Sequence, residues 1–253
     1  MQITEQEKAV RVDLAAAYRL IAHFNLDDGI YTHISARVPG TDDQFLINPF
    51  GMPFRDITAT SLVKIDVNGN LIGESTYDVN PAGFTIHSAV HMARHDAACV
   101  LHTHTEAGMA VASLECGLMP FNQWALQFYN RVAYHEFEGL ALDLDERKRL
   151  AEDLGTQATV LILRNHGLLT VGRSVPEAVI FMLALERACR TQLKIQSSGQ
   201  PVHPIPPEIC ERTLAQMESG GGNPVDGQFT LQQRAWRALL KRLEPSPASS
   251  FRD

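Results

Sequence analysis

Apolar side chains recur every three or four positions over the first 25 residues, which predicts an amphipathic helix that ends near Asn25. Thr4 followed by Glu7 predicts a capping box at the start of this helix. Its apolar positions are Val10, Leu14, Ala17, Leu20 and Ile21.

The pattern then changes to short β-like runs at 31–38, 45–48 and 61–66, separated by Pro, Gly and Asn turn signals. Helical spacing returns at 81–95, and a buried strand that ends in histidines is predicted at 97–104. Further helices are predicted at 106–114, 143–154 and 176–195, and further strands at 159–163 and 168–171. Pro176 lies near the start of the last helix, where its missing N–H costs nothing. Helices mixed with hairpin-like strands predict an α/β domain of three layers.

The chain changes character near residue 198. Five prolines lie between Pro201 and Pro224, and three consecutive glycines occupy positions 220–222. This composition is typical of a linker or wrapping arm. A last amphipathic helix is predicted at 230–243, followed by a disordered tail. We therefore divide the chain into a domain at 1–198 and an arm with one helix at 199–253.

Composition narrows the classes of partner. The 253 residues are 45% hydrophobic and 20% charged, with a formal net charge of −7, as in an ordinary globular protein. We find no Lys/Arg cluster of the kind that binds nucleic acid, and no apolar run long enough to span a bilayer. The four cysteines show no CxxC pairing, and Cys99 and Cys189 are predicted to be buried thiols. These features favour a cytoplasmic protein with a small-molecule substrate.

Three of the ten histidines are placed as metal ligands would be. His102 and His104 are two residues apart at a strand end, so their side chains share one face. His166 lies in a tight turn after another strand, and neighbouring strand ends meet at one edge of a sheet. Three imidazoles and a water are a usual catalytic zinc arrangement. The alternative is that these histidines make polar contacts at strand ends.

Two ordered motifs decide between these readings. The run NPAGFTIHSAVHMARHDAACVLHTHTEAGMAVASLECGLMP, followed by VLILRNHGLLTVG, resembles the class II aldolase/adducin family. YTHISARVPG and FLINPFGMPF continue the resemblance, which covers about residues 8–200. It implies an α/β/α sandwich around a mainly antiparallel sheet, and a divalent ion held by His102, His104 and His166. Zinc is the first expectation, with manganese, cobalt or nickel as alternatives.

The chain departs from the enzymes of this family at two places. The carboxylate that serves them as acid/base aligns with Gly83, so His87 and Glu106 are the remaining candidates. The alternatives are a structural hydrogen-bonded role for His87 and a helix-dipole role for Glu106.

The family's phosphate-binding positions read here as Thr32-His33, Phe50-Gly51 and Pro81-Ala82. Phe50 cannot hydrogen-bond a phosphate and Pro81 has no N–H to offer. His33, Asn48 and Gly51 are the candidate substrate-binding residues, and the substrate is expected to be unphosphorylated.

Two functions follow from the resemblance. The first is a metal-dependent lyase that performs aldol cleavage, epimerisation or decarboxylation on a small hydroxy-carbonyl compound, through an enolate stabilised by zinc. The second is a non-catalytic, adducin-like oligomerisation or binding module with a structural or vestigial metal. The resemblance also implies a homotetramer with sites near subunit interfaces. We expect the Pro-rich arm and the final helix to pack on a neighbouring subunit.

Overall fold

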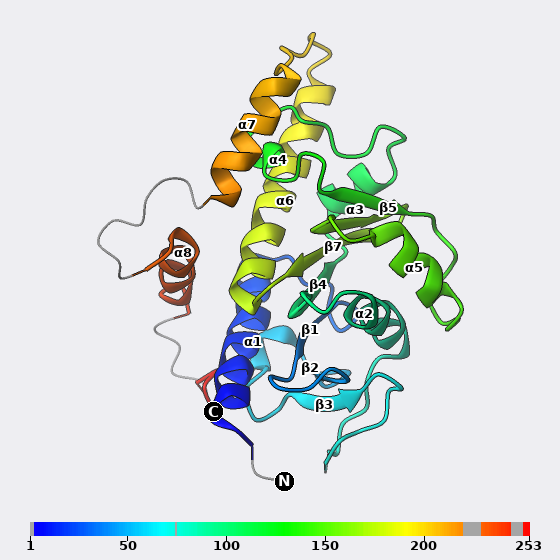
Figure 1. Ribbon diagram of the computed structural model, residues 1–253, viewed down its shortest axis with the longest axis vertical. Coiled ribbons are helices and arrows are strands. Elements are labelled where there is room, and N and C mark those ends of the chain that lie inside the picture. The colour runs from blue at the N-terminus through cyan, green and yellow to red at the C-terminus, as the bar shows by residue number, and fades with distance from the viewer. Residues whose placement is uncertain (1–2, 74, 220–228, 244–249) are drawn as a thin grey trace.

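One seven-stranded sheet organises the molecule (Figure 1). The computed structural model describes residues 3–73, 75–219, 229–243 and 250–253. The strand order is β3-β2-β1-β4-β7-β6-β5, and every pair is antiparallel except β5 with β6. The strands are β1 (His33–Arg37), β2 (Gln44–Ile47), β3 (Val63–Asp66), β4 (Cys99–Thr103), β5 (Val132–His135), β6 (Val160–Leu163) and β7 (Gly167–Gly172).

Helices cover both faces of the sheet, as the three-layer prediction requires. One face packs against α1 (Glu5–His23), α3 (Glu106–Ala112) and α6 (Val175–Ser197), and α8 (Leu231–Leu240) packs on α6 and α1. The other face packs against α2 (Pro81–Ala93) and α5 (Glu146–Leu154). Strand β4 is central and buried on both faces, since Cys99 and Leu101 belong to the first core and Val100 to the second. The α/β/α sandwich with a mainly antiparallel, mixed sheet is confirmed.

Helix α1 begins as the sequence indicates, but only half of the predicted capping box forms. The Thr4 side chain accepts a hydrogen bond from the Glu7 backbone N–H at 3.1 Å. The Glu7 carboxylate instead accepts from Arg11 at 2.9 Å and from Lys64 at 2.7 Å. It is buried and joins α1 to β3, because two cations within reach stabilise a buried carboxylate better than one backbone N–H.

The C-terminal part is more ordered than its prolines indicate. Helix α7 (Pro207–Glu218) was not predicted; Pro207 occupies its first turn, where proline is tolerated. Helix α8 was expected to pack on a neighbouring subunit, but its Trp236 is 7% exposed within the chain's own core. Phe251 is buried in that core too, so the disordered-tail prediction is wrong for residues 250–253; residues 245–249 lie outside the described residues.

The predicted boundary at residue 198 therefore falls between segments that share one hydrophobic core. Whether residues 1–198 fold alone stays a prediction. Three other short elements were also not predicted from the sequence: η1 (Phe54–Asp56), α4 (Gln123–Leu126) and β5.

Candidate metal centre

The ends of β4 and β7 bring three predicted ligands together. His102 is in β4, His104 follows that strand by one residue, and His166 lies in the turn between β6 and β7. One ring nitrogen of each residue lies within 4.8 Å of the other two. His102 is buried, while His104 and His166 are half-buried, so the cluster has one protected and one more open side.

The turn before β7 has a local cause in the sequence. Asn165 takes a left-handed backbone conformation with φ of 56°, which asparagine tolerates better than most residues. The His166 N–H donates to the Leu163 carbonyl oxygen at 3.1 Å and closes the turn. At Gly167 an added Cβ would be 2.4 Å from the Thr103 carbonyl oxygen, so only glycine lets β7 approach β4 this closely.

Hydrogen bonds to the other ring nitrogens orient two of the ligands. His102 Nδ1 lies 3.0 Å from the Leu168 carbonyl oxygen, and His104 Nδ1 lies 2.9 Å from Asp28 Oδ2. Both partners accept, so each Nδ1 carries the proton and each Nε2 presents a lone pair. Carboxylate and carbonyl partners of this kind orient histidines that bind metals.

The three Nε2 atoms converge on one point. His104 Nε2 is 2.8 Å from His102 Nε2 and 2.9 Å from His166 Nε2. Two lone pairs at this separation repel each other unless a cation lies between them. The donor set of three neutral imidazoles therefore fits a divalent ion such as zinc.

Burial keeps these rings in the form that binds metal. Desolvation and the neighbouring imidazoles hold the pKa of His102 well below its usual value. The same two causes lower the pKa of His166 to about 4. Near neutral pH both rings are unprotonated, and no proton competes with an ion for Nε2.

His33, His87 and Gly83 also lie at this end of the sheet. His33 pairs with His102 across β1 and β4, and their ring centroids are 5.3 Å apart. His87, on α2, approaches His33 with its Nε2 2.9 Å from His33 Nδ1. Gly83, with which the sequence resemblance aligns the acid/base carboxylate of the family's enzymes, lies against the His33 ring. An added Cβ would be 2.4 Å from His33 Cδ2.

The remaining predicted residues lie elsewhere. Asn48 accepts a hydrogen bond from the Tyr18 hydroxyl at 2.8 Å, on the α1 side of the sheet. Gly51 is exposed in the turn after β2 with φ of 90°. Glu106 is exposed in the first turn of α3. Their roles in substrate binding or catalysis stay predictions.

Asp28 is the residue of this site that the sequence did not reveal. It lies in the loop after α1, 76 positions before His104, and its side chain is 50% exposed. An acidic residue in a polar loop has no pattern that distinguishes it, so only the folded arrangement identifies its partner.

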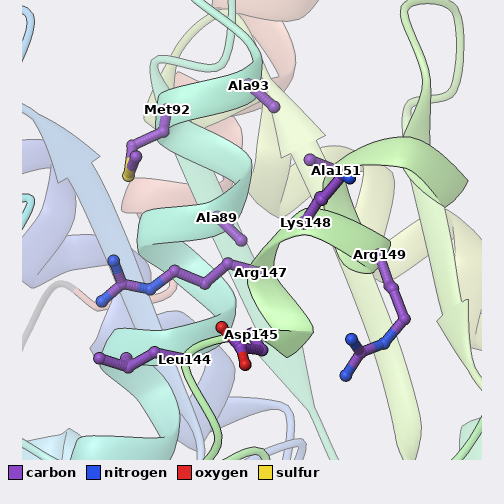
Figure 2. A pocket seen from close by; sticks show the side chains of 9 residues that line it. All are labelled: Ala89, Met92, Ala93, Leu144, Asp145, Arg147, Lys148, Arg149 and Ala151. Carbon is purple, nitrogen blue, oxygen red and sulfur yellow. The ribbon is translucent and has the colours of Figure 1, made fainter.

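A hollow separate from the three histidines has a volume of about 590 Å³ and a lining that includes Met92, Leu144 and Arg147. Figure 2 shows these side chains between α2 and α5. None of the three metal-ligand candidates lines this hollow. Among the described residues, no helix combines the length and the apolarity needed to cross a bilayer.

The family model described as "Class II Aldolase and Adducin N-terminal domain" matches residues 12–193. This chain belongs to that family.

Solved structures and curated relatives from both branches of the family are similar to it. An aldolase II superfamily protein from Pseudomonas syringae is 48% identical with a TM-score of 0.89, over 99% of this chain and 98% of the other. The L-fuculose 1-phosphate aldolase of Glaciozyma antarctica is 30% identical with a TM-score of 0.80, over 96% and 92%. Alpha-adducin of Rattus norvegicus is 44% identical over 94% of this chain, which spans 33% of that protein.

Proposed function

We propose that this protein is a metal-dependent lyase that acts on a small, unphosphorylated hydroxy-carbonyl compound. The observation that supports it most is the convergence of three histidine Nε2 atoms, with the Nδ1 atoms of His102 and His104 held by hydrogen-bond acceptors. Such a centre is built to hold an ion, and the more open side at His104 and His166 leaves access for a ligand.

Zinc, or manganese, cobalt or nickel in its place, would supply a Lewis acid toward the carbonyl and hydroxyl oxygens and so favour an enolate. His102, His104 and His166 would hold this ion. His33 lies beside His102, and His87 lies against His33 with its Nε2 2.9 Å from His33 Nδ1. His87 and Glu106 remain the candidates for the acid/base, because Gly83 carries no side chain.

The lyase proposal is tested by incorporation of deuterium from D2O at carbon. Aldol cleavage and decarboxylation form the enolate by breaking a C–C bond, and epimerisation can form it by loss of the α-hydrogen. In each case protonation of the enolate from D2O places deuterium on the carbon next to the carbonyl of the product. We expect zinc-loaded protein to incorporate deuterium with at least one member of a hydroxy-ketone and hydroxy-acid panel, while chelator-treated protein and His166→Ala should be inactive. No incorporation by the zinc-loaded protein on the whole panel would contradict the proposal.

Two observations favour the second candidate, a non-catalytic adducin-like module. The His33 ring fills the space that a side chain at Gly83 would need, and alpha-adducin is 44% identical to this chain. X-ray absorption on the zinc-loaded protein separates the two. An exchangeable water beside three imidazole nitrogens favours the lyase, while a closed shell of protein ligands favours the module.

We further propose a homotetramer with sites near its interfaces, and a cytoplasmic location. Phe137, Leu140, Leu142 and Leu144 are all more than half exposed, and Phe137 lies 6.3 Å from His166 between ring centroids. An exposed apolar strip of this kind favours contact with another subunit beside the site. Light scattering at micromolar concentration tests it, and a monomer would contradict it. The four free cysteines are compatible with a reducing compartment.

A further inference from the structure

A row of four buried polar side chains lies behind the metal centre, between β1 and α2. His33 Nδ1 is 2.9 Å from His87 Nε2, and His87 Nδ1 is 2.6 Å from Ser35 Oγ. Ser35 Oγ is 2.7 Å from His91 Nε2, and His91 Nδ1 is 3.0 Å from the Ala97 carbonyl oxygen. All four side chains belong to residues no more than 3% exposed.

The last member of the row fixes the direction of every hydrogen bond. A carbonyl oxygen only accepts, so His91 Nδ1 carries the proton and His91 Nε2 accepts. The single Ser35 hydroxyl hydrogen therefore goes to His91, and Ser35 Oγ accepts from His87 Nδ1–H. His87 Nε2 is then unprotonated and accepts from His33 Nδ1–H. With neutral rings, His33 Nε2 is left as a lone pair.

The three rings are buried, and burial disfavours the charged form of an imidazole. At the far end of the row, desolvation lowers the pKa of His91 to about 3, and the Arg37 guanidinium acts in the same direction.

His33 Nε2, which carries this lone pair, lies next to Gly83, where the resemblance places the acid/base carboxylate of the family's enzymes. The Cδ2–Nε2 edge of His33 faces Gly83, where an added Cβ would be 2.6 Å from Nε2. The same ring lies beside His102. Within the described part of the chain, His33 Nε2 has no hydrogen-bond partner. Because Gly83 has no side chain, the His33 ring of β1 fits beside α2, and its Nε2 can act as a hydrogen-bond acceptor.

We propose that His33 is a specificity residue whose Nε2, fixed as a hydrogen-bond acceptor by His87, Ser35 and His91, takes a substrate hydroxyl and discriminates against phosphate. A hydroxyl donates to this lone pair, whereas the terminal oxygens of a phosphate monoester dianion only accept and would leave both groups unsatisfied. The inference rests on the proposed function for the identity of the ligand. The acceptor itself is a property of the folded chain.

Nitrogen-15 spectra of histidine-labelled, full-length protein at pH 7 test the row directly, in chelator-treated and in zinc-loaded samples. We expect His33, His87 and His91 to be Nδ1–H tautomers. In Ser35→Ala the row is cut, so His33 and His87 should lose this fixed tautomer while His91 keeps it. Ser88→Ala is the matched control, because Ser88 is a buried serine on α2 between His87 and His91 that donates to the Thr85 carbonyl oxygen instead of joining the row.

A His33 ring protonated at Nε2 in the unsubstituted protein would overturn the proposal. The same holds if the His33 tautomer is unchanged in Ser35→Ala. If Ser35→Ala fails to fold, the spectrum of the unsubstituted protein still decides, because it alone reports which His33 nitrogen is protonated.

Binding of methyl phosphate at pH 8, where this monoester is a dianion without a P–OH group, tests the discrimination. His33→Asn replaces the acceptor with an amide that can donate, so we expect methyl phosphate to bind this variant about tenfold more tightly. Equal methyl phosphate affinity of the two proteins would overturn the proposed role. Neither the spectra nor this titration requires turnover, so they can fail or succeed independently of the lyase proposal.

Discussion

At the scale of single residues, the candidate metal centre depends on contacts outside its three histidines. Strand alternation predicted that His102 and His104 share a face, and the family resemblance added His166; the three lie together in the structure. The hydrogen-bond partners of these histidines were not predictable, since Asp28 and His104 are 76 positions apart. The same is true of Gly83 and His33, whose contact exists only because α2 crosses β1 at that point. Sequence patterns report local geometry, and these contacts are not local.

Asp28 should strengthen metal binding by holding His104 in the right tautomer. We expect Asp28→Ala to weaken zinc binding by about 10- to 100-fold, as loss of such outer partners typically does. Competition with a chromophoric chelator measures the affinity, and Asp27→Ala is the neighbouring control. Equal affinities for the two variants would show that Asp28 does not support the centre.

Gly167 should be intolerant of any side chain. In Gly167→Ala the new Cβ would meet the Thr103 carbonyl oxygen at 2.4 Å and would press on the His102 and His104 rings at 3.2 Å. We expect a loss of about 1–3 kcal/mol in the free energy of unfolding, together with weaker zinc binding. Denaturant titration and chelator competition measure the two effects. An unfolding midpoint and a zinc affinity equal to those of the original protein would contradict the packing described for β7.

At the scale of elements, the sequence predicted the central strands and the longer helices well, because their apolar spacing is strong. It missed β5, a four-residue edge strand with three partly exposed positions, where alternation carries little signal. It missed α7 because prolines read as helix breakers, although one in the first turn is tolerated. The prediction that α8 packs on a neighbouring subunit was also wrong. An amphipathic pattern shows which face of a helix is apolar, but it does not show what that face packs against.

Helix α8 should contribute to the stability of the whole domain. Trp236 packs in the core with α1 and α6, and its indole N–H lies 3.1 Å from Asp13 Oδ1. We expect Trp236→Ala to reduce the free energy of unfolding by about 3 kcal/mol. Leu231→Ala, on the same helix but 63% exposed, should change it by less than about 0.5 kcal/mol. Equal unfolding midpoints for the two variants would contradict the assignment of α8 to this core.

At the scale of the whole molecule, the buried histidines should make stability depend on pH. The pKa of His91 is lowered from 6.5 to about 3 by burial first and by the Arg37 guanidinium second. Unfolded chains therefore bind a proton at this residue that the folded protein excludes. The resulting stability is fully present above pH 6.5 and is lost as the pH falls toward 3.

Chelator-treated protein should accordingly unfold at progressively lower urea concentration between pH 7 and pH 4.5. The other buried imidazoles, His33, His87 and His102, act in the same direction because their pKa values are lowered too. A urea midpoint that stays constant across this range would mean that these rings are protonated in the folded state or that they become exposed.

The proposed metal centre and the lyase activity both require one ion held by His102, His104 and His166. Elemental analysis of untagged protein, before and after zinc is supplied, measures this directly. We predict about one equivalent of a divalent metal in the unsubstituted protein and none in His102→Ala/His104→Ala. The exposed pair His95→Ala/His203→Ala is the control and should retain it. Absence of metal from the zinc-supplied protein, or its retention in the first double variant, would contradict the metal centre and with it the lyase.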